Sequence, residues 1–300
     1  MSRRYASPAS FKEALEARLK RDAAGGFALQ RRRQSLVFQR FLARVQAQLG
    51  NAILKGGFAL EIRLERARST RDVDLVLHGP HASLLEQLRA AGQLDLDDFM
   101  TFEVQEKRHA PDVTGDGVRY GGKRYTVECK LAGKLYGSRF GADIVFGGPM
   151  LGEPAWVDGG DFLGFVGISA PKFRVLPVET HIAEKLHAYT LPRATANDRF
   201  RDLPDIALLA TARERLTCRR IQEAIAQTFE YRGTHGAPGS VPPPPPAWID
   251  LYAELAREHE LSWSTLDEVF TAVARFLDPA LAMEDGVWDR EAWSWGPHHG

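Results

Sequence analysis

The sequence predicts a two-part α/β protein, with a mixed α/β region to about residue 170 and a helical region after it. In the first region, short apolar runs of strand character alternate with helical patterns. After Pro177, apolar residues recur at helical spacing in five successive segments. Five prolines at 242–246 interrupt these helices, because proline lacks a backbone donor and fits neither a helix interior nor a central strand.

The first region alternates helices and strands along the chain. Ser10 and Glu13 have capping-box spacing, which predicts a helix from Ser10 to about Asp22. Apolar residues at 27–49 recur with a helical period, and Gly50 ends that pattern. The other expected elements of this region are helices at 58–64 and 82–92 and strands at 52–54, 71–77, 100–109, 118–132 and 138–146.

The second region begins after a stretch, 150–178, that is rich in glycine and proline and has few helix signals. The segment 231–246 is predicted to be a stiff, extended connector. We place a first domain at 1–170 and a helical domain at 171–300. The expected helices of the second domain are 179–191, 202–213, 217–229, 247–259 and 264–278.

The composition narrows the class of protein. The chain has 300 residues, 44% hydrophobic and 26% charged, which is ordinary for a globular protein and excludes wholesale disorder. Its two cysteines, Cys129 and Cys218, exclude a disulfide scaffold and a four-cysteine zinc site. No apolar run approaches the roughly 18 residues of a membrane helix, and the first residues lack the apolar core of a signal peptide. We expect a cytoplasmic protein with no membrane partner.

The charge of the chain is balanced overall but unevenly distributed. The 39 basic and 39 acidic residues cancel. Residues 1–50 nevertheless carry a net charge of +8, and residues 248–300 carry −8. A charge run of this kind is usually a solvated face, but it is also a legitimate indication of a charged partner.

Two glycines and two aspartates carry the strongest chemical signal. Gly56-Gly57 follows a buried strand and opens a helix, where backbone N–H groups bind phosphate. Asp72 and Asp74 alternate along a strand and therefore share one face. Two adjacent carboxylates repel each other, and a hard divalent cation such as Mg²⁺ or Mn²⁺ removes that penalty. Each feature alone is more often structural, but together they predict an enzyme that handles a nucleoside triphosphate.

A third carboxylate would complete a two-metal clamp for phosphoryl transfer. Asp143 is the candidate, because it is the one acid in the apolar strand 140–146, where an unpaired charge is costly. Asp158 and Asp161 are rivals, but both lie in a glycine-rich loop.

Four segments resemble one known family. Residues 55–60, Lys-Gly-Gly-Phe-Ala-Leu, followed by Arg-x-Thr-x-Asp-x-Asp-Leu at 68–75, are similar to the AbiEii nucleotidyltransferase toxins, which include the mycobacterial MenT toxins. Residues 179–188 resemble that family's Glu-x-x-x-Ala-Glu-Lys-Leu helix, and residues 199–206 resemble its Arg-Asp-Leu-x-Asp-Leu motif. The resemblance covers roughly residues 35–280.

The resemblance implies a polymerase-β-like nucleotidyltransferase core, with the helical C-terminal domain completing the active-site cleft. It implies magnesium-dependent transfer of a nucleotide, with a pyrimidine NTP among the expected donors, to the 3′ end of tRNA, which blocks translation. It also implies a toxin of a type IV toxin–antitoxin or phage-defence pair, with an AbiEi-type antitoxin as partner. We expect the chain to be a monomer.

The resemblance also implies roles for individual residues. Lys185 is expected to act on the phosphates as a point charge. Asp202 and Asp205 are i, i+3 neighbours, so one, with Asp202 favoured as a catalytic residue, is expected to position Lys185 or the nucleotide while the other caps the helix or pairs with Arg201. Asp143 would also help to deprotonate the attacking hydroxyl. The expected metal ligands are Asp72, Asp74 and Asp143. The expected nucleotide contacts are Lys55, Gly56, Gly57, Arg68, Thr70 and Asp205, where the threonine replaces the family's usual serine.

Two other functions remain open from the sequence. The same fold could modify a protein or a small molecule such as an antibiotic, or the chain could be an inactive binding module. Asp72, Asp74 and Lys185 favour an enzyme. For an RNA acceptor, the basic segment 1–50 is predicted to line the mouth of the Asp72/Asp74 cleft and to contact phosphates.

Overall fold

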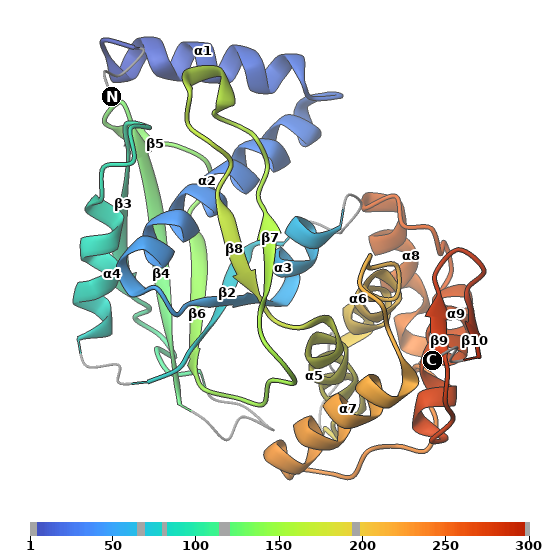
Figure 1. Cartoon of the computed structure of the whole chain (residues 1–300). Helices are drawn as coiled ribbons and strands as arrows, with labels where there is room; N and C mark the ends of the chain where they lie inside the picture. Colours follow the sequence, from blue (N-terminus) through green and yellow to red (C-terminus); the bar gives the residue numbers. More distant parts are fainter. Residues whose placement is uncertain (1–4, 65–69, 80–82, 114–120, 194–198, 298–300) are drawn as a thin grey trace.

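The computed structural model describes residues 5–64, 70–79, 83–113, 121–193 and 199–297. A first lobe holds a mixed sheet with flanking helices, and a second lobe is helical (Figure 1). The predicted fold class is therefore confirmed. No helix within these ranges combines the length and apolar character that a membrane crossing needs.

The first lobe is built around one sheet with the strand order β3-β4-β6-β2-β1-β8-β7. Its central strand β2 pairs in parallel with β6 and antiparallel with β1. The short strand β5 pairs antiparallel with the end of β4, outside this order. The strands are β1 (Ile53–Lys55), β2 (Asp72–Leu77), β3 (Met100–Glu106), β4 (Gly122–Leu131), β5 (Lys134–Leu135), β6 (Phe140–Phe146), β7 (Ala155–Asp158) and β8 (Lys172–Val175).

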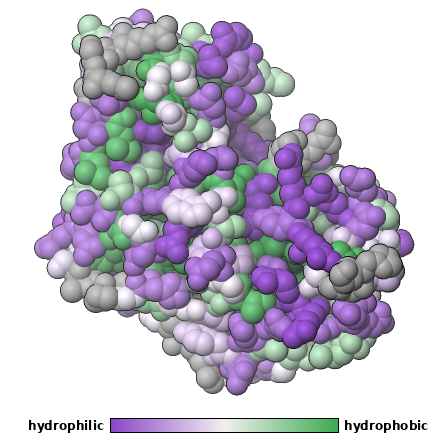
Figure 2. Space-filling view, in the orientation of Figure 1, coloured by the Kyte–Doolittle hydropathy of each residue, from purple (hydrophilic) through white to green (hydrophobic). Residues whose placement is uncertain are grey.

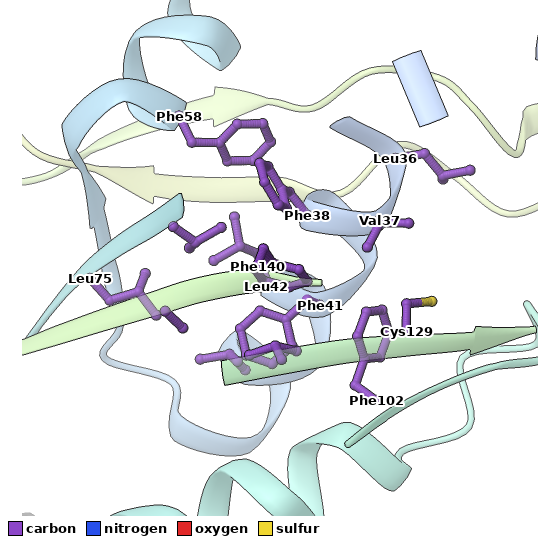
Figure 3. Packing of buried hydrophobic residues seen from close by; sticks show 14 of the residues in the cluster. Leu36, Val37, Phe38, Phe41, Leu42, Phe58, Leu75, Phe102, Cys129 and Phe140 are labelled. Atoms are coloured by element: carbon purple, nitrogen blue, oxygen red, sulfur yellow. The ribbon is translucent and has the colours of Figure 1, made fainter. Parts of the chain in front are cut away.

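An aromatic core fixes the helices to this sheet (Figure 3). Phe38 of α2 packs edge-on against Phe58 of α3 at 4.9 Å and against Phe140 of β6 at 4.8 Å between ring centroids. One helix thus holds both the strand that carries Asp143 and the helix that begins at Gly56. The helices of this lobe are α1 (Pro8–Arg21), α2 (Gly26–Leu49), α3 (Gly56–Arg63) and α4 (Leu84–Gln93).

A buried ion cluster joins α2 to the segment before β3. Asp98 is fully buried and accepts hydrogen bonds from Arg40 and from both terminal nitrogens of Arg44. Burial alone would raise the pKa of Asp98, but Arg44 and Arg40 outweigh it and lower that pKa. Two arginines of the basic segment 1–50 are therefore structural.

The second lobe packs around its own hydrophobic cluster. The segment 233–245 connects two of its helices without regular structure, and Tyr189 donates a hydrogen bond to the carbonyl of Pro242 within it. The predicted connector, 231–246, was too long at both ends, because Tyr231 and Arg232 still belong to a helix and Pro246 opens a 3-10 turn. The elements of this lobe are α5 (Val178–Thr190), α6 (Asp202–Leu209), α7 (Cys218–Arg232), α8 (Ile249–Glu258), α9 (Leu266–Leu281), β9 (Val287–Asp289) and β10 (Ser294–Gly296).

Local predictions were wrong at several points. The first helix begins at Pro8, and its N-cap is Ser7, which accepts from the Ser10 N–H, because proline suits the first helical turn. The glycine-rich stretch 150–178 contributes β7 and β8 at the edge of the sheet. These strands are only four residues long, so periodicity gave too little signal for them.

Candidate active site

A row of four charged residues, Lys55, Asp74, Asp143 and Arg124, crosses the sheet on the face opposite the aromatic core. Val73, Leu75 and Leu77 of β2 are buried in that core, so Asp72 and Asp74 project from the other face.

The strand register sets the order of this row. Lys55 is paired with Asp74, Asp74 with Asp143, and Asp143 with Arg124. Two neighbouring carboxylates are thus flanked by a cation on each side, and Arg124 donates to the Asp143 carboxylate at 3.1 Å.

Two glycines make room for the carboxylates of Asp72 and Asp74. Gly56 has φ +68°, and a Cβ there would lie 2.0 Å from Oδ2 of Asp74. A Cβ on Gly141 would lie 2.4 Å from Oδ1 of Asp72, which accepts a hydrogen bond from the Gly141 N–H at 3.0 Å. Gly56 was predicted from its place before a helix, whereas the role of Gly141 depends on strand pairing and was missed.

The carboxylate row opens into a cavity of about 510 Å³ between the two lobes. Helix α5 forms the facing wall. Of the predicted site residues, the cavity brings together Lys55, Gly56, Gly57, Thr70, Asp72, Asp74, Asp143, Lys185 and Asp202. Arg68 lies outside the described residues.

Lys185 faces the cavity and is held by two buried aspartates. Its Nζ lies 3.0 Å from Asp202 Oδ1 and 2.7 Å from Asp205 Oδ2, and both aspartates are buried. Asp202 lines the cavity, whereas Asp205 lies behind Lys185 and does not line it. Both acids hold the lysine, and Arg199 approaches Asp202 at 3.7 Å.

The residue before Lys185 joins the two lobes. Glu184 accepts hydrogen bonds from Lys55 at 3.0 Å and from Arg232 of α7 at 3.3 Å. Burial would raise the pKa of Glu184, but the charges of Lys55 and Arg232 outweigh it and lower the pKa to about 2. Glu184 therefore fixes the lysine that precedes the glycine turn, a role that the sequence alone did not assign.

The pKa values of Asp74 and Asp143 are raised. Burial raises the pKa of Asp74 to about 6 against the opposing charge of Lys55, and the neighbouring Asp143 adds to the rise. Burial also raises the pKa of Asp143, against the effect of Arg124. Across the described residues, no three acidic, histidine or cysteine side chains converge as ready-made metal ligands. The carboxylates nevertheless offer several oxygen donors and carry negative charge close together. A hard divalent cation prefers such donors and offsets such charge.

His181 lies one turn before Lys185 on the cavity wall. It is 1% exposed, and its Nε2 has no hydrogen-bond partner within the described part of the chain. Burial and, to a lesser extent, the charge of Lys185 lower the pKa of His181 to about 3, so the ring is neutral at pH 7. A neutral, unsatisfied imidazole at this place is available to a bound ligand.

The prediction that the basic segment 1–50 lines this cavity was wrong. No described residue of that segment lies on its wall. Arg40 and Arg44 are buried on Asp98, and Arg33 is bound to Glu16 at 2.6 Å. The cations of the cavity come from later in the chain, where no charge run marks them: Lys55, Lys185, Arg71, Arg193, Arg199, Arg201 and Arg232.

Paired strand carboxylates, a glycine turn that opens a helix and a facing lysine define the class of this site as that of a nucleotidyltransferase. The model of one family, described as nucleotidyl transferase AbiEii toxin of type IV toxin–antitoxin systems, matches residues 40–292. The chain belongs to this family of nucleotidyltransferase toxins. Such a toxin implies an antitoxin partner.

One solved structure shares the fold at low sequence identity, and a second is a weaker match. The nucleotidyltransferase toxin MenT4 from Mycobacterium tuberculosis is 16% identical, with a TM-score of 0.50, over 93% of this chain and 92% of that one. The protein JHP933 from Helicobacter pylori is 14% identical, with a TM-score of 0.44, over 83% of this chain and 94% of that one. No functionally curated protein sequence matches the chain.

Replacing Gly56 with alanine is expected to damage the site. The left-handed backbone costs a non-glycine residue about 1–2 kcal/mol, and the new Cβ would displace the Asp74 carboxylate. We expect Gly56→Ala to lower both the free energy of unfolding in urea and nucleotide binding. Gly26→Ala is the control, because a Cβ there has no neighbour within 4 Å. Equal stability and equal nucleotide binding of the two variants would contradict this account of Gly56.

Replacing Glu184 with glutamine is expected to weaken the lobe contact above pH 4.5. The variant leaves Lys55 and Arg232 without their buried anion, at a cost of about 3–5 kcal/mol. Because the pKa of Glu184 is lowered to about 2 in the folded state, its contribution is present above pH 4.5 and is lost as pH falls toward 2. Urea unfolding at pH 7 and pH 3 should therefore show a smaller difference between the variant and the wild type at pH 3. A difference that does not change with pH would contradict the ion-pair role.

Proposed function

We propose that this toxin transfers a nucleotide from an NTP to the 3′ end of tRNA in a magnesium-dependent reaction. One observation carries the proposal: the strand register places Asp74 beside Asp143 in a cavity that Lys185 faces. Adding a nucleotide to this end would prevent loading of an amino acid and would block translation.

The cavity suits a nucleoside triphosphate in size and charge. Its volume of about 510 Å³ is within the range of small-ligand pockets. The first turn of α3 offers the N–H groups of Gly56 and Gly57 to phosphate oxygens. Lys185 and the cavity arginines supply positive charge for the rest of the triphosphate.

Asp72, Asp74 and Asp143 are the residues that would hold magnesium. Their donor set fits, because a bound cation offsets both the burial and the carboxylate repulsion that raise the pKa of Asp74. When bound, the metal supplies electrostatic stabilisation of the charge that develops on the phosphate oxygens.

The reaction is an in-line displacement at the α-phosphorus. The 3′-hydroxyl oxygen of the acceptor forms the new bond to phosphorus, and the bond from that phosphorus to the pyrophosphate breaks. The hydroxyl proton passes to the carboxylate of Asp143. Lys185, held by Asp202 and Asp205, neutralises negative charge as the pyrophosphate leaves.

The Asp74→Asn variant tests the proposed function. It preserves the shape of the side chain but removes a carboxylate from the row, so we expect NTP transfer to fall at least a hundredfold. The assay is labelling of bulk tRNA with each of the four radioactive NTPs in the presence of MgCl₂ or EDTA. Asp112→Asn is the control, because Asp112 is exposed and pairs with Lys123 outside the cavity.

Two results would overturn the proposal. The first is full labelling of tRNA by Asp74→Asn. The second is labelling of protein or of a small-molecule acceptor, but not of tRNA, by the wild type.

A further inference from the structure

A second, larger cavity lies between the lobes, next to the C-terminal end of α3. Its volume is about 1080 Å³, above the usual range for a small ligand. One wall comes from α2, the end of α3 and the residues from β7 onward, and the other from the end of α6 and the segment 259–263. Figure 2 shows an indentation between the lobes, with hydrophilic residues along much of its edge.

The two cavities adjoin each other. His259 lines both of them. Leu64 lines the second cavity at the end of α3, and Thr70, six residues later, lines the first. A polymer whose end reacts at Asp74 and Asp143 could therefore continue into the second cavity.

Cations predominate on the walls of the second cavity. Five arginines line it, against Glu61, Asp158 and Glu260. Asp158 is already paired with Lys172 at 3.4 Å. Glu61 is largely buried, which raises its pKa against the charge of Arg31. The arginines are Arg31, Arg32, Arg63, Arg213 and Arg290.

Two of these arginines keep buried donors that the described residues do not satisfy. The side chain of Arg63 is 4% exposed, and its Nε and Nη1 have no hydrogen-bond partner there, although Nη1 lies 3.2 Å from Glu214. The Nε of Arg32 is also buried without a partner among the described residues, although its Nη2 lies 3.8 Å from Asp22. An unsatisfied buried donor is costly, and anionic oxygens satisfy guanidinium groups best.

Aromatic side chains stand among the arginines. Trp263 and Phe162 line opposite walls of the cavity, and both are partly buried. Arg32 covers the ring of Phe162 at 5.7 Å, and Trp263 contacts Trp293 at 5.5 Å between centroids. A groove that combines arginines with aromatic rings is typical of proteins that bind single-stranded nucleic acid.

We propose that this second cavity binds the unpaired nucleotides that precede the reacting 3′ end of the RNA acceptor. The proposal rests on the proposed function, because it assumes an RNA acceptor. Phosphates contact the arginines of both lobes, and a base stacks on Trp263. A strand held between two walls must be free of its complement, so the site selects single-stranded ends over duplex.

The test uses the full-length chain with arginines replaced on both walls, in the double variant Arg32→Gln/Arg213→Gln. Binding of a fluorescent 12-nucleotide single-stranded RNA is measured by anisotropy between 50 and 300 mM KCl. We expect at least tenfold weaker binding at 100 mM KCl and a salt slope smaller by about 1.4, at about 0.7 for each lost phosphate contact. In labelling assays, KM for RNA should rise while KM for the NTP stays unchanged.

Two further variants separate charge from structure. Arg219→Gln is the control, because Arg219 is 82% exposed on α7 and lines neither cavity. The double variant Arg32→Lys/Arg213→Lys keeps the charge and should recover most of the salt slope.

The possible outcomes distinguish this inference from the proposed function. A wild-type chain that labels no RNA overturns the proposed function. If the wild-type chain labels RNA but the Arg32→Gln/Arg213→Gln variant keeps the same KM for RNA and the same salt slope, only the proposed role of the second cavity is overturned. Equal binding of a duplex of the same length would also overturn it.

Discussion

The placement of β2 between β1 and β6 is the constraint on which the site depends. It puts Asp74 between Lys55 and Asp143, and the pairing of β4 with β6 adds Arg124 on the far side of Asp143. Two adjacent carboxylates in a sheet repel each other, and this arrangement survives because cations flank the pair. The two glycines that abut the aspartates follow from the same register, since any larger residue at Gly56 or Gly141 would collide with a carboxylate.

Helix α5 converts this row of charges into a site shared by two lobes. Its consecutive residues Glu184 and Lys185 belong to separate ion networks, one reaching Lys55 of the first lobe and one held by Asp202 and Asp205. The first network secures the glycine turn, and the second aims a charge into the cavity. Burial and the neighbouring carboxylates raise the pKa of Asp74 to about 6, even though the charges of Lys55 and Lys185 oppose the rise.

The fold class and the residues Gly56, Gly57, Asp72 and Asp74 could be predicted from local signals, namely strand alternation and the glycine turn. Lys185, Asp202 and Asp205 were predicted from the resemblance to a known family. The roles of Gly141, Arg124 and Glu184 could not be predicted, because they depend on pairing between distant segments. The prediction for the basic segment 1–50 failed for a related reason. A count of charges does not show that Arg40 and Arg44 are buried in ion pairs with Asp98. Strands as short as β7 and β8 also carry too few residues for a pattern.

The most direct test of the carboxylate row as the nucleotide and metal site is a crystal structure of the chain with Mn²⁺ and a non-hydrolysable NTP. We expect anomalous density for manganese between Asp72 and Asp74, and we expect the phosphates to lie between the turn at Gly56 and Lys185. Manganese and phosphates bound elsewhere, with Asp143 still paired to Arg124 and the cavity empty, would contradict it.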